Sequence, residues 1–310
     1  MTRTPAGEGA GALALSLCAS LAVTSCGTVP ARAATVNGSA ITRSDFERDL
    51  QALAENPSFF NITGGTEVSI EGDAARSWLS QVITWRTAEE LLADHGLEPS
   101  QESVADLNSQ VAASEDAQRL PESMKDEIVR GVAAVQSLPL IPAPSPSDLE
   151  AQYAAEPAGT GALCLRHIVV ETEAEAQAVL AELDAGTDFA ELATERSIEP
   201  AAAETGGALA GGDGNACLPV SEYQTGFDPA FTEGGLAATA GVPTDPVESE
   251  FGWHVILVRP YDEVADDLLT LVSTAPGDAA LTGELATADV SIDPRYGRWD
   301  PVRGDVVSLR

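Results

Sequence analysis

Four prolines fall within eight residues near the middle of the chain, from Pro139 to Pro146. Proline removes a backbone donor and fixes its own φ angle, so this stretch cannot continue a helix. We therefore predict a linker rich in proline and glycine over residues 139–161, with one short helix in it. The chain has 310 residues, which is enough for a domain on either side of this linker.

The N-terminal segment has the pattern of a targeting signal. An apolar run from Gly11 to Val23 is too short to span a bilayer and is typical of a secretory signal. It is followed directly by Thr24-Ser25-Cys26, and the whole junction resembles the lipobox of bacterial lipoproteins. We expect residues 1–25 to be a lipoprotein signal peptide, Cys26 to carry lipid, and residues 26–33 to be a linker.

Two localisations are compatible with this segment. With lipid on Cys26, the protein is exported and anchored to the outer face of the cytoplasmic membrane as a cell-envelope lipoprotein. Cleavage before Ala34, after a small-x-small site, would instead give a secreted soluble protein.

The charge of the chain excludes several classes of partner. There are 16 Lys and Arg residues against 49 Asp and Glu residues, a formal net charge of -33. Nucleic-acid binding needs clustered cations, so we expect no nucleic-acid partner. Docking on anionic lipid through a basic face is disfavoured as well, but attachment through acyl chains needs no basic patch. With only four cysteines and three histidines, we expect no metal site.

Export also decides what the cysteines can do. Cys18 would leave with the signal and Cys26 would take lipid, so Cys164 and Cys217 remain in a compartment that permits disulfides. We predict that these two are bonded, which the chain-entropy estimate values at about 4 kcal/mol. The alternative is a pair of free buried thiols.

Residues 34–138 have the pattern of a helical domain. A small hairpin is expected around Asn37-Gly38, and Thr42 with Asp45 three residues later marks a helix start. Trp78, Val82 and Trp85 lie on one stripe of a second helix. The predicted helices after the first cover residues 74–95, 100–118 and 121–137.

Residues 162–262 combine strands and helices. An apolar, β-branched run over 163–170 predicts a strand, and Thr172 with Glu175 predicts the capped start of a helix that Gly186 ends. A second short helix is expected around Phe189. The run from Phe251 to Val258 predicts a final strand that can pair centrally, since it contains no proline.

Five motifs follow one another through this block: Arg166–Val170, Asp188–Ala193, Gly206–Leu209, Pro246-Val247 and Phe251–Ile256. In this order they resemble the parvulin family of peptidyl-prolyl cis-trans isomerases. The resemblance implies an α+β fold, with a four-stranded, mostly antiparallel sheet and surrounding helices. Residues 35–53 also resemble the N-terminal part of SurA- and PrsA-type exported chaperones, which implies a helical chaperone-like domain.

The resemblance implies a site in which His167 and His254 form a pair beneath the substrate. Glu199 stands where relatives have Cys or Asp, although it could also be one more solvated acid. Leu209 matches the leucine of the family's glycine-rich turn, and Phe227 or Phe231 would form the aromatic floor of a proline slot. Isomerisation in such an apolar slot needs no covalent step and no cofactor.

We therefore expect an extracytoplasmic peptidyl-prolyl isomerase and folding chaperone for exported proteins. Its partners would be unfolded or partly folded exported polypeptides that contain X-Pro bonds. The alternative is a holdase that binds without turnover, because Gly207-Ala208-Leu209-Ala210 lacks the acid of the family's turn. We expect the tail, residues 263–310, to pack on the helical domain, as in related chaperones.

Overall fold

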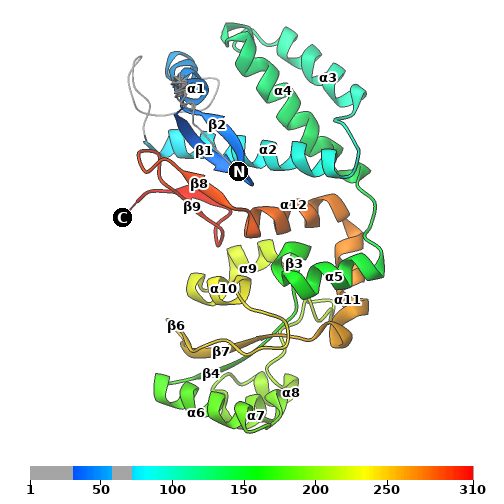
Figure 1. The fold of residues 1–310 in the computed structure, drawn as a ribbon, viewed down its shortest axis with the longest axis vertical. Helices are drawn as coiled ribbons and strands as arrows, with labels where there is room; N and C mark the ends of the chain where they lie inside the picture. The colour runs from blue at the N-terminus through cyan, green and yellow to red at the C-terminus, as the bar shows by residue number, and fades with distance from the viewer. Residues whose placement is uncertain (1–30, 58–71, 310) are drawn as a thin grey trace, which may run out of the picture. The chain divides into compact units, whose positions relative to one another are not determined.

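The computed structural model of the chain describes residues 31–57 and 72–309 (Figure 1). The predicted signal peptide at 1–25 and the lipid on Cys26 lie outside these residues. The linker predicted over 26–33 extends too far, because strand β1 begins at Arg32. No helix in the two described ranges is long and apolar enough to cross a membrane.

A hairpin opens the described chain, formed by β1 (Arg32–Val36) and β2 (Ser39–Thr42). Its turn residues Asn37 and Gly38 have φ angles of 48° and 88°, a region that Asn and Gly tolerate better than other residues. The predicted hairpin is thus confirmed. Thr42 then caps the next helix by accepting a hydrogen bond from the Asp45 amide, also as predicted.

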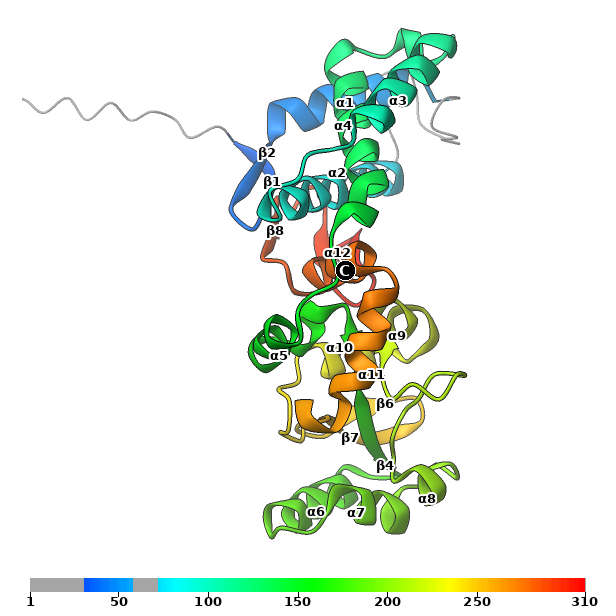
Figure 2. The ribbon, with the colours of Figure 1, turned by 90° about the vertical axis from the view of Figure 1, so that its right-hand side faces the viewer.

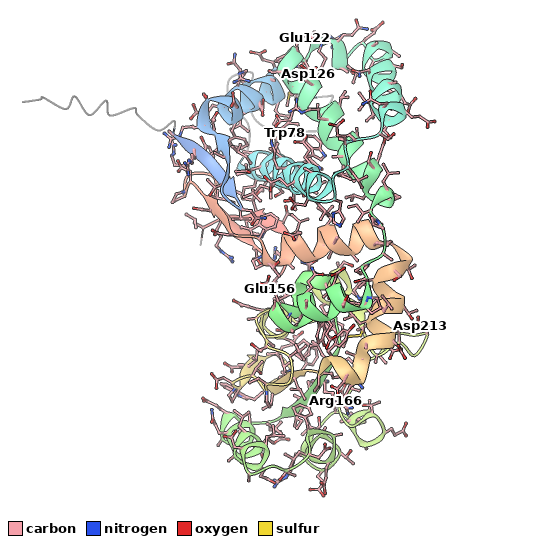
Figure 3. The ribbon with its side chains drawn as sticks, turned by 45° about the vertical axis from the view of Figure 1, so that its right-hand side comes forward. Trp78, Glu122, Asp126, Glu156, Arg166 and Asp213 are labelled. Carbon is pink, nitrogen blue, oxygen red and sulfur yellow. A yellow bond between two sulfur atoms is a disulfide. The ribbon has the colours of Figure 1, made fainter. Side chains whose placement is uncertain are left out.

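Within the described ranges, helices make up most of the first half of the chain. They are α1 (Arg43–Glu55), α2 (Gly72–Asp94), α3 (Gln101–Ala113), η1 (Ala117–Arg119), α4 (Glu122–Ser137) and η2 (Leu138–Leu140). Trp78 of α2, labelled in Figure 3, meets Trp85 edge to face at 5.4 Å. Gly131 of α4 lies so close to Trp85 that a Cβ atom would come within 2.3 Å of the ring. Glycine therefore lets α4 pack directly on the tryptophan stripe of α2.

The segment predicted as a linker carries two helical elements, α5 (Pro146–Ala155) and η3 (Pro157–Thr160). Pro146 occupies the first turn of α5, where its missing amide has no partner to lose, and Ser145 caps that turn. Tyr153 is buried, and its hydroxyl donates a hydrogen bond to the Arg259 carbonyl at 2.8 Å. The segment is thus packed against the block that follows.

That block is built on an antiparallel sheet in the order β4-β7-β6. The strands of the block are β3 (Ala162–Leu163), β4 (Leu165–Val170), β5 (Leu218–Pro219), β6 (Val247–Ser249) and β7 (Gly252–Val258). The mixed α+β class is confirmed. Four strands were expected in this sheet, and it has three, β4, β7 and β6; beside them, an isolated antiparallel bridge joins Ala208 to Arg166 at the outer edge of β4.

Helices cover both faces of this sheet (Figures 1 and 2). They are α6 (Glu173–Asp184), α7 (Phe189–Arg196), α8 (Ala202–Thr205), α9 (Val220–Gly226) and α10 (Pro229–Leu236). Ile168 and Val255 pack with α6 and α7 in one apolar cluster, and Leu165 and Ile256 pack with Phe231 of α10 in another. The sheet therefore has two buried faces, one of which carries the residues predicted for function.

The C-terminal segment consists of α11 (Tyr261–Thr274), α12 (Pro276–Thr287), β8 (Val290–Ile292), β9 (Arg298–Asp300) and β10 (Asp305–Val307). Leu268 of α11 is buried in the same cluster as Tyr153 of α5. In contrast, β8 pairs with β1 in antiparallel fashion, with Thr35 opposite Ser291. The end of the chain thus returns to the first strand, as Figure 1 shows.

Candidate functional site

Strand register places two histidines on the same face of the sheet. In the β4–β7 ladder His167 lies opposite Ile256, and Val169 lies opposite His254. Because side chains alternate between the faces of a strand, both imidazoles point to the side covered by α10. Their diagonal placement brings the two ring Nδ1 atoms to 3.2 Å from each other. The rings are nearly parallel, at an interplanar angle of 15°.

Ser249 of β6 holds the second imidazole from the other side. Its Oγ atom lies 2.8 Å from His254 Nε2 and accepts a hydrogen bond from the Phe251 amide at 3.0 Å. We assign the hydroxyl proton to His254 Nε2, the nearer of its two acceptors, since the Gly252 carbonyl is 3.4 Å away. In this assignment the His254 proton lies on Nδ1 and is donated to His167 Nδ1, and His167 carries its own proton on Nε2, which faces Glu199.

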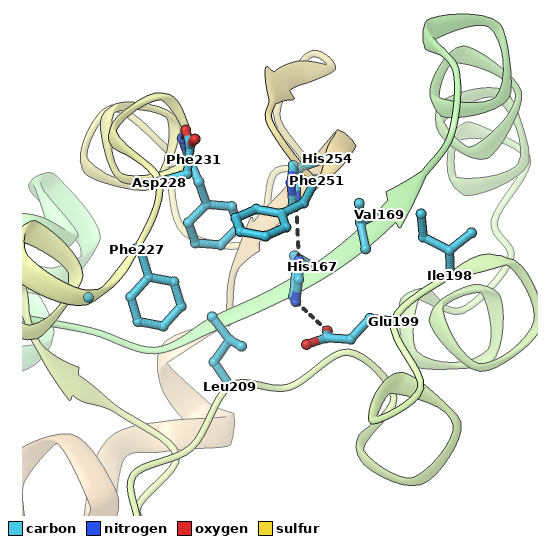
Figure 4. A pocket seen from close by; sticks show the side chains of 11 residues that line it. His167, Val169, Ile198, Glu199, Leu209, Phe227, Asp228, Phe231, Phe251 and His254 are labelled. Atoms are coloured by element: carbon cyan, nitrogen blue, oxygen red, sulfur yellow. Dashed lines mark hydrogen bonds and ion pairs between the residues drawn. The ribbon is translucent and has the colours of Figure 1, made fainter.

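Glu199 lies at the open end of this chain of contacts. Its Oε2 atom is 2.7 Å from His167 Nε2, and its side chain is 37% exposed. The distance is that of a hydrogen bond, but the alignment is poor, and His167 Nε2 has no well-directed partner among the described residues. The contact is therefore mainly an electrostatic attraction between the carboxylate and the imidazole N–H (Figure 4).

Burial keeps both imidazoles neutral at physiological pH. His167 and His254 are only 6% and 5% exposed. Burial, with a smaller contribution from His167, lowers the pKa of His254 to about 4. Burial also lowers the pKa of His167, against the opposing effect of the Glu199 carboxylate. The pair therefore presents hydrogen-bonding dipoles and no positive charge.

A cavity of about 410 Å³ opens beside this pair, and its walls are mostly apolar. The Phe231 ring packs its edge against both imidazoles, at centroid distances of 5.3 Å and 5.2 Å. Phe227 stacks on Phe231 at 5.7 Å, and Leu209 closes the same side. The sequence left open which phenylalanine lines the slot, and the structure places both of them there (Figure 4).

The Leu209 wall is fixed by a glycine turn along the edge of β4. The Gly207 carbonyl accepts a hydrogen bond from the His167 amide at 2.9 Å, and the Leu209 amide donates to the Leu165 carbonyl at 3.0 Å. Gly207 has a φ of 76°, and a Cβ atom there would come within 2.3 Å of the His167 carbonyl. Only glycine therefore fits this turn, and the alanine that replaces the family's acid at position 208 does not prevent it from forming.

Asp228 caps the helix that carries Phe231. It lies between Phe227 and Pro229, and its carboxylate caps α10 by accepting hydrogen bonds from the amides of Ala230 and Phe231, at 2.8 Å and 3.4 Å. Asp228 was not predicted as a site residue from the sequence. An aspartate followed by proline at the first helical position was the available signal.

Cys164 and Cys217 are joined by a disulfide in the structure. Both residues are fully buried, at 0% and 1% exposure. Cys164 directly precedes β4, so the bond ties the loop before β5 to the strand that carries His167. These are the same two cysteines that were paired from the sequence.

The structure brings His167, Glu199, His254, Leu209, Phe227 and Phe231 together around one cavity. Cys26 lies outside the described residues. Six residues of the site were not predicted from the sequence: Val169, Ile198, Gly226, Asp228 and Phe251, which line the cavity, and Ser249, which contacts His254. Within the described ranges, no group of three or more His, Cys, Asp or Glu side chains is placed to hold a metal ion.

Comparison with known proteins identifies the central block. Residues 169–260 match the family described as "Rotamase: PPIC-type PPIASE domain". The foldase protein PrsA of Clostridium botulinum (strain Okra) is 36% identical over 110 residues, which are 33% of this chain and 30% of the relative. The foldase protein PrsA of Clostridium kluyveri is 40% identical over 92 residues, 30% of this chain and 25% of the relative. The chain thus matches less than a third of the length of these relatives.

Solved structures were compared as well. PrsA from Bacillus subtilis aligns over 82% of this chain and 91% of its own length, with 17% identity and a TM-score of 0.28. NmPin, the parvulin of Nitrosopumilus maritimus, aligns over 32% of this chain and 96% of its own, with 27% identity and a TM-score of 0.27. The family match and the PrsA relatives show that the central block, over residues 169–260, is similar to the parvulin-type peptidyl-prolyl isomerases.

Proposed function

We propose that the chain is a peptidyl-prolyl cis-trans isomerase and folding chaperone for exported proteins. The observation that carries this proposal is the neutral, buried imidazole pair beside an apolar cavity of about 410 Å³. The foldase names of the relatives support it for the matched third of the chain.

The mechanism follows from the electronic structure of the X-Pro bond. Rotation crosses a barrier of about 18–20 kcal/mol because the amide loses its resonance when it twists. The twisted state is less polar than the planar amide, so a cavity that excludes water favours the twisted state over the planar one. The reaction then proceeds without a covalent intermediate, and without a cofactor.

Each residue of the site has a definite role in this proposal. Phe227, Phe231 and Leu209 hold the proline ring. His167 and His254 shape the cavity through their hydrogen-bonded contact and offer no charge that would hold water. Glu199 places a carboxylate beside the twisting bond, at the open end of the cavity.

The location that we propose is extracytoplasmic, with lipid on Cys26 as the anchor. It rests on the apolar N-terminal run and the lipobox-like junction. A disulfide between Cys164 and Cys217 agrees with an oxidising compartment. The clients are unfolded exported chains with X-Pro bonds, and the net charge of -33 favours neutral or basic ones.

A holdase that binds X-Pro segments without turnover is the second candidate. The poor alignment between Glu199 and His167 favours it, because a carboxylate that is not well directed contributes less to the twisted state.

An isomerisation assay on a short X-Pro peptide separates the two candidates. We expect the wild type to accelerate isomerisation, and His167→Ala, His254→Ala and Glu199→Ala to be slower by about tenfold or more. His95→Ala is the matched control, because this third histidine lies outside the block and is exposed. A wild type that leaves the uncatalysed rate unchanged while suppressing aggregation of an unfolded protein would instead identify the holdase.

A further inference from the structure

Helix α9, which leads directly into Phe227 of the cavity, is too short to be stable by itself. It spans only Val220–Gly226, it begins after Pro219 without a side-chain cap, and its last residue is a glycine. Isolated helices shorter than about 12–15 residues are marginal in water, so α9 depends on its packing. The Phe227 amide donates to the Tyr223 carbonyl at 3.2 Å, so Phe227 is tied to the last turn of α9. The contacts that hold α9 therefore also place one wall of the cavity.

Tyr223 supplies the contacts of α9 within the central block. It is fully buried, and its hydroxyl donates a hydrogen bond to the Leu163 carbonyl at 3.2 Å. Its ring packs on the Phe227 ring at a centroid distance of 4.8 Å. Its carbonyl accepts a hydrogen bond from Thr232 Oγ1 of α10 at 3.0 Å. These contacts fasten α9 to β3 and to α10.

Gln224 supplies a contact from outside this block. Its Nε2 atom donates a hydrogen bond to the Pro301 carbonyl at 2.7 Å, across 77 residues of sequence. Pro301 lies in the turn between β9 and β10, in the C-terminal segment of the chain. Gln224 and Phe227 are three residues apart, a spacing at which helical residues are neighbours. The Pro301 carbonyl therefore supports the same turn of α9 that carries Phe227.

The turn that contains Pro301 is itself fastened to the helical domain. The Asp300 carboxylate accepts a hydrogen bond from the Val302 amide at 3.2 Å, which closes the turn. The Val306 amide of β10 then donates to Ser80 Oγ of α2 at 2.8 Å, and this bond is buried. The acceptor for Gln224 is thus held by a helix that lies far from the central block in sequence.

We propose that Gln224 is a positioning residue for the isomerase, because its bond to the Pro301 carbonyl holds α9, and with it Phe227, in the place that the proline ring requires. The inference rests on the proposed function. It adds that proline binding in the central block depends on a contact from the C-terminal segment, because residues 162–262 alone do not contain Pro301. Without the Gln224 donor, the last turn of α9 is held only by Tyr223, and Phe227 is less well fixed against the ring.

The test uses Gln224→Leu in the full chain, which removes the donor and keeps a side chain of similar size. We expect KM for a short X-Pro peptide to rise by about threefold to tenfold, the range for one neutral hydrogen bond. The value of kcat should stay within about twofold, because Phe227 contacts the proline ring in the planar and twisted states alike. Gln224→Lys should restore KM, since an ammonium group can donate to the same carbonyl.

Gln152→Leu is the matched control. Gln152 Nε2 also donates to a backbone carbonyl, that of Gly159 at 2.8 Å, but Gln152 does not line the cavity. We expect this variant to keep the KM and the kcat of the wild type. A loss of the same size in Gln152→Leu and Gln224→Leu would overturn the inference, because any lost bond of this kind would then have the effect.

The outcomes separate this inference from the proposed function. Equal KM values for Gln224→Leu and the wild type overturn the inference and leave the isomerase intact, and so does a Gln224→Lys variant as impaired as Gln224→Leu. If the wild type shows no turnover, the isomerase fails, and the dissociation constant of the peptide, from a titration followed by NMR, replaces KM. Gln224→Leu should then bind about threefold to tenfold more weakly. Equal dissociation constants, or no binding to the wild type, would overturn the inference.

Discussion

Burial makes the imidazole of His254 sensitive to acid. The pKa of His254 is lowered to about 4, whereas an unfolded histidine titrates near 6.5. Between these values the unfolded chain binds a proton that the folded chain does not, so stability falls as the pH decreases from about 6.5 to about 4.

We therefore predict that His254 makes the protein less stable in mild acid. From pH 7 to pH 5 its contribution to the loss is about 2 kcal/mol in the free energy of unfolding. Urea unfolding at both pH values should show that His254→Gln loses correspondingly less stability than the wild type. His95→Gln, at an exposed histidine, should lose as much as the wild type. Identical losses in His254→Gln and the wild type would contradict the prediction.

Ser249 is a positioning residue, because it acts on the substrate only through His254. Without its hydroxyl, His254 Nε2 loses the donor that fixes its tautomer. We predict that Ser249→Ala lowers kcat/KM on an X-Pro peptide by about tenfold, which corresponds to one hydrogen bond of about 1–1.5 kcal/mol. Ser249→Thr should restore activity, since it keeps the hydroxyl. A serine needed only for folding would not be rescued in this way, and Ser221→Ala, at an exposed serine, should have no effect.

At the scale of elements, the helices whose ends are set by nearby capping residues were predicted from the sequence. Thr172 and Glu175 form the expected capping box, and the predicted helix over 121–137 is observed as Glu122–Ser137. Helix α10 was missed because Gly234 and Gly235 weaken its helical pattern, and packing supplies what propensity lacks.

The residues of the site divide in the same way, into those that a local motif predicts and those that depend on contacts with a distant segment. The histidines were identified because a family motif surrounds each of them. Ser249 and Ile198 were not, because each matters only through pairing with a distant segment: Ser249 through the β6–β7 hairpin, and Ile198 through its contact with Val169. Register across strands and loops is a tertiary property, and periodicity along one segment does not carry it.

The disulfide belongs to this scale because it links two elements. Cys164 and Cys217 are 53 residues apart in sequence, so their bond closes a large loop. We predict that the unfolded, unreduced protein gains two thiols on reduction. The double variant Cys164→Ala/Cys217→Ala should be less stable than the wild type by about 2–4 kcal/mol in urea unfolding.

A matched comparison isolates the effect of the cross-link. The same double variant should unfold at the same urea concentration with and without reductant, while the wild type should shift toward the variant when reduced. A wild type whose unfolding is indifferent to reductant, or whose thiol count does not rise, would show that the two cysteines are free.

At the scale of the whole described chain, one helix joins the two halves. Helix α12 packs against both η2 and η3 through glycines. A Cβ atom at Gly277 would lie 2.1 Å from the Leu138 carbonyl oxygen, and one at Gly283 would lie 2.0 Å from the Gly159 carbonyl oxygen. Backbone thus packs directly on backbone where the N-terminal half, the proline-rich segment and the C-terminal segment meet.

A Gly→Ala substitution at this junction has two opposing effects on the free energy of unfolding. In an exposed helix Gly→Ala stabilises by about 1 kcal/mol, because alanine restricts the unfolded chain and favours helix. At Gly283 the contact with Gly159 should dominate, since a backbone carbonyl cannot move away without shifting η3. We predict that Gly283→Ala lowers the free energy of unfolding by about 1–3 kcal/mol, the usual cost of overpacking. Gly212→Ala, where a new Cβ atom meets nothing within 4 Å, is the control and should stay within about 0.5 kcal/mol of the wild type. Urea unfolding of the three proteins decides it, and a Gly283→Ala variant as stable as the wild type would mean that α12 does not pack this closely in solution.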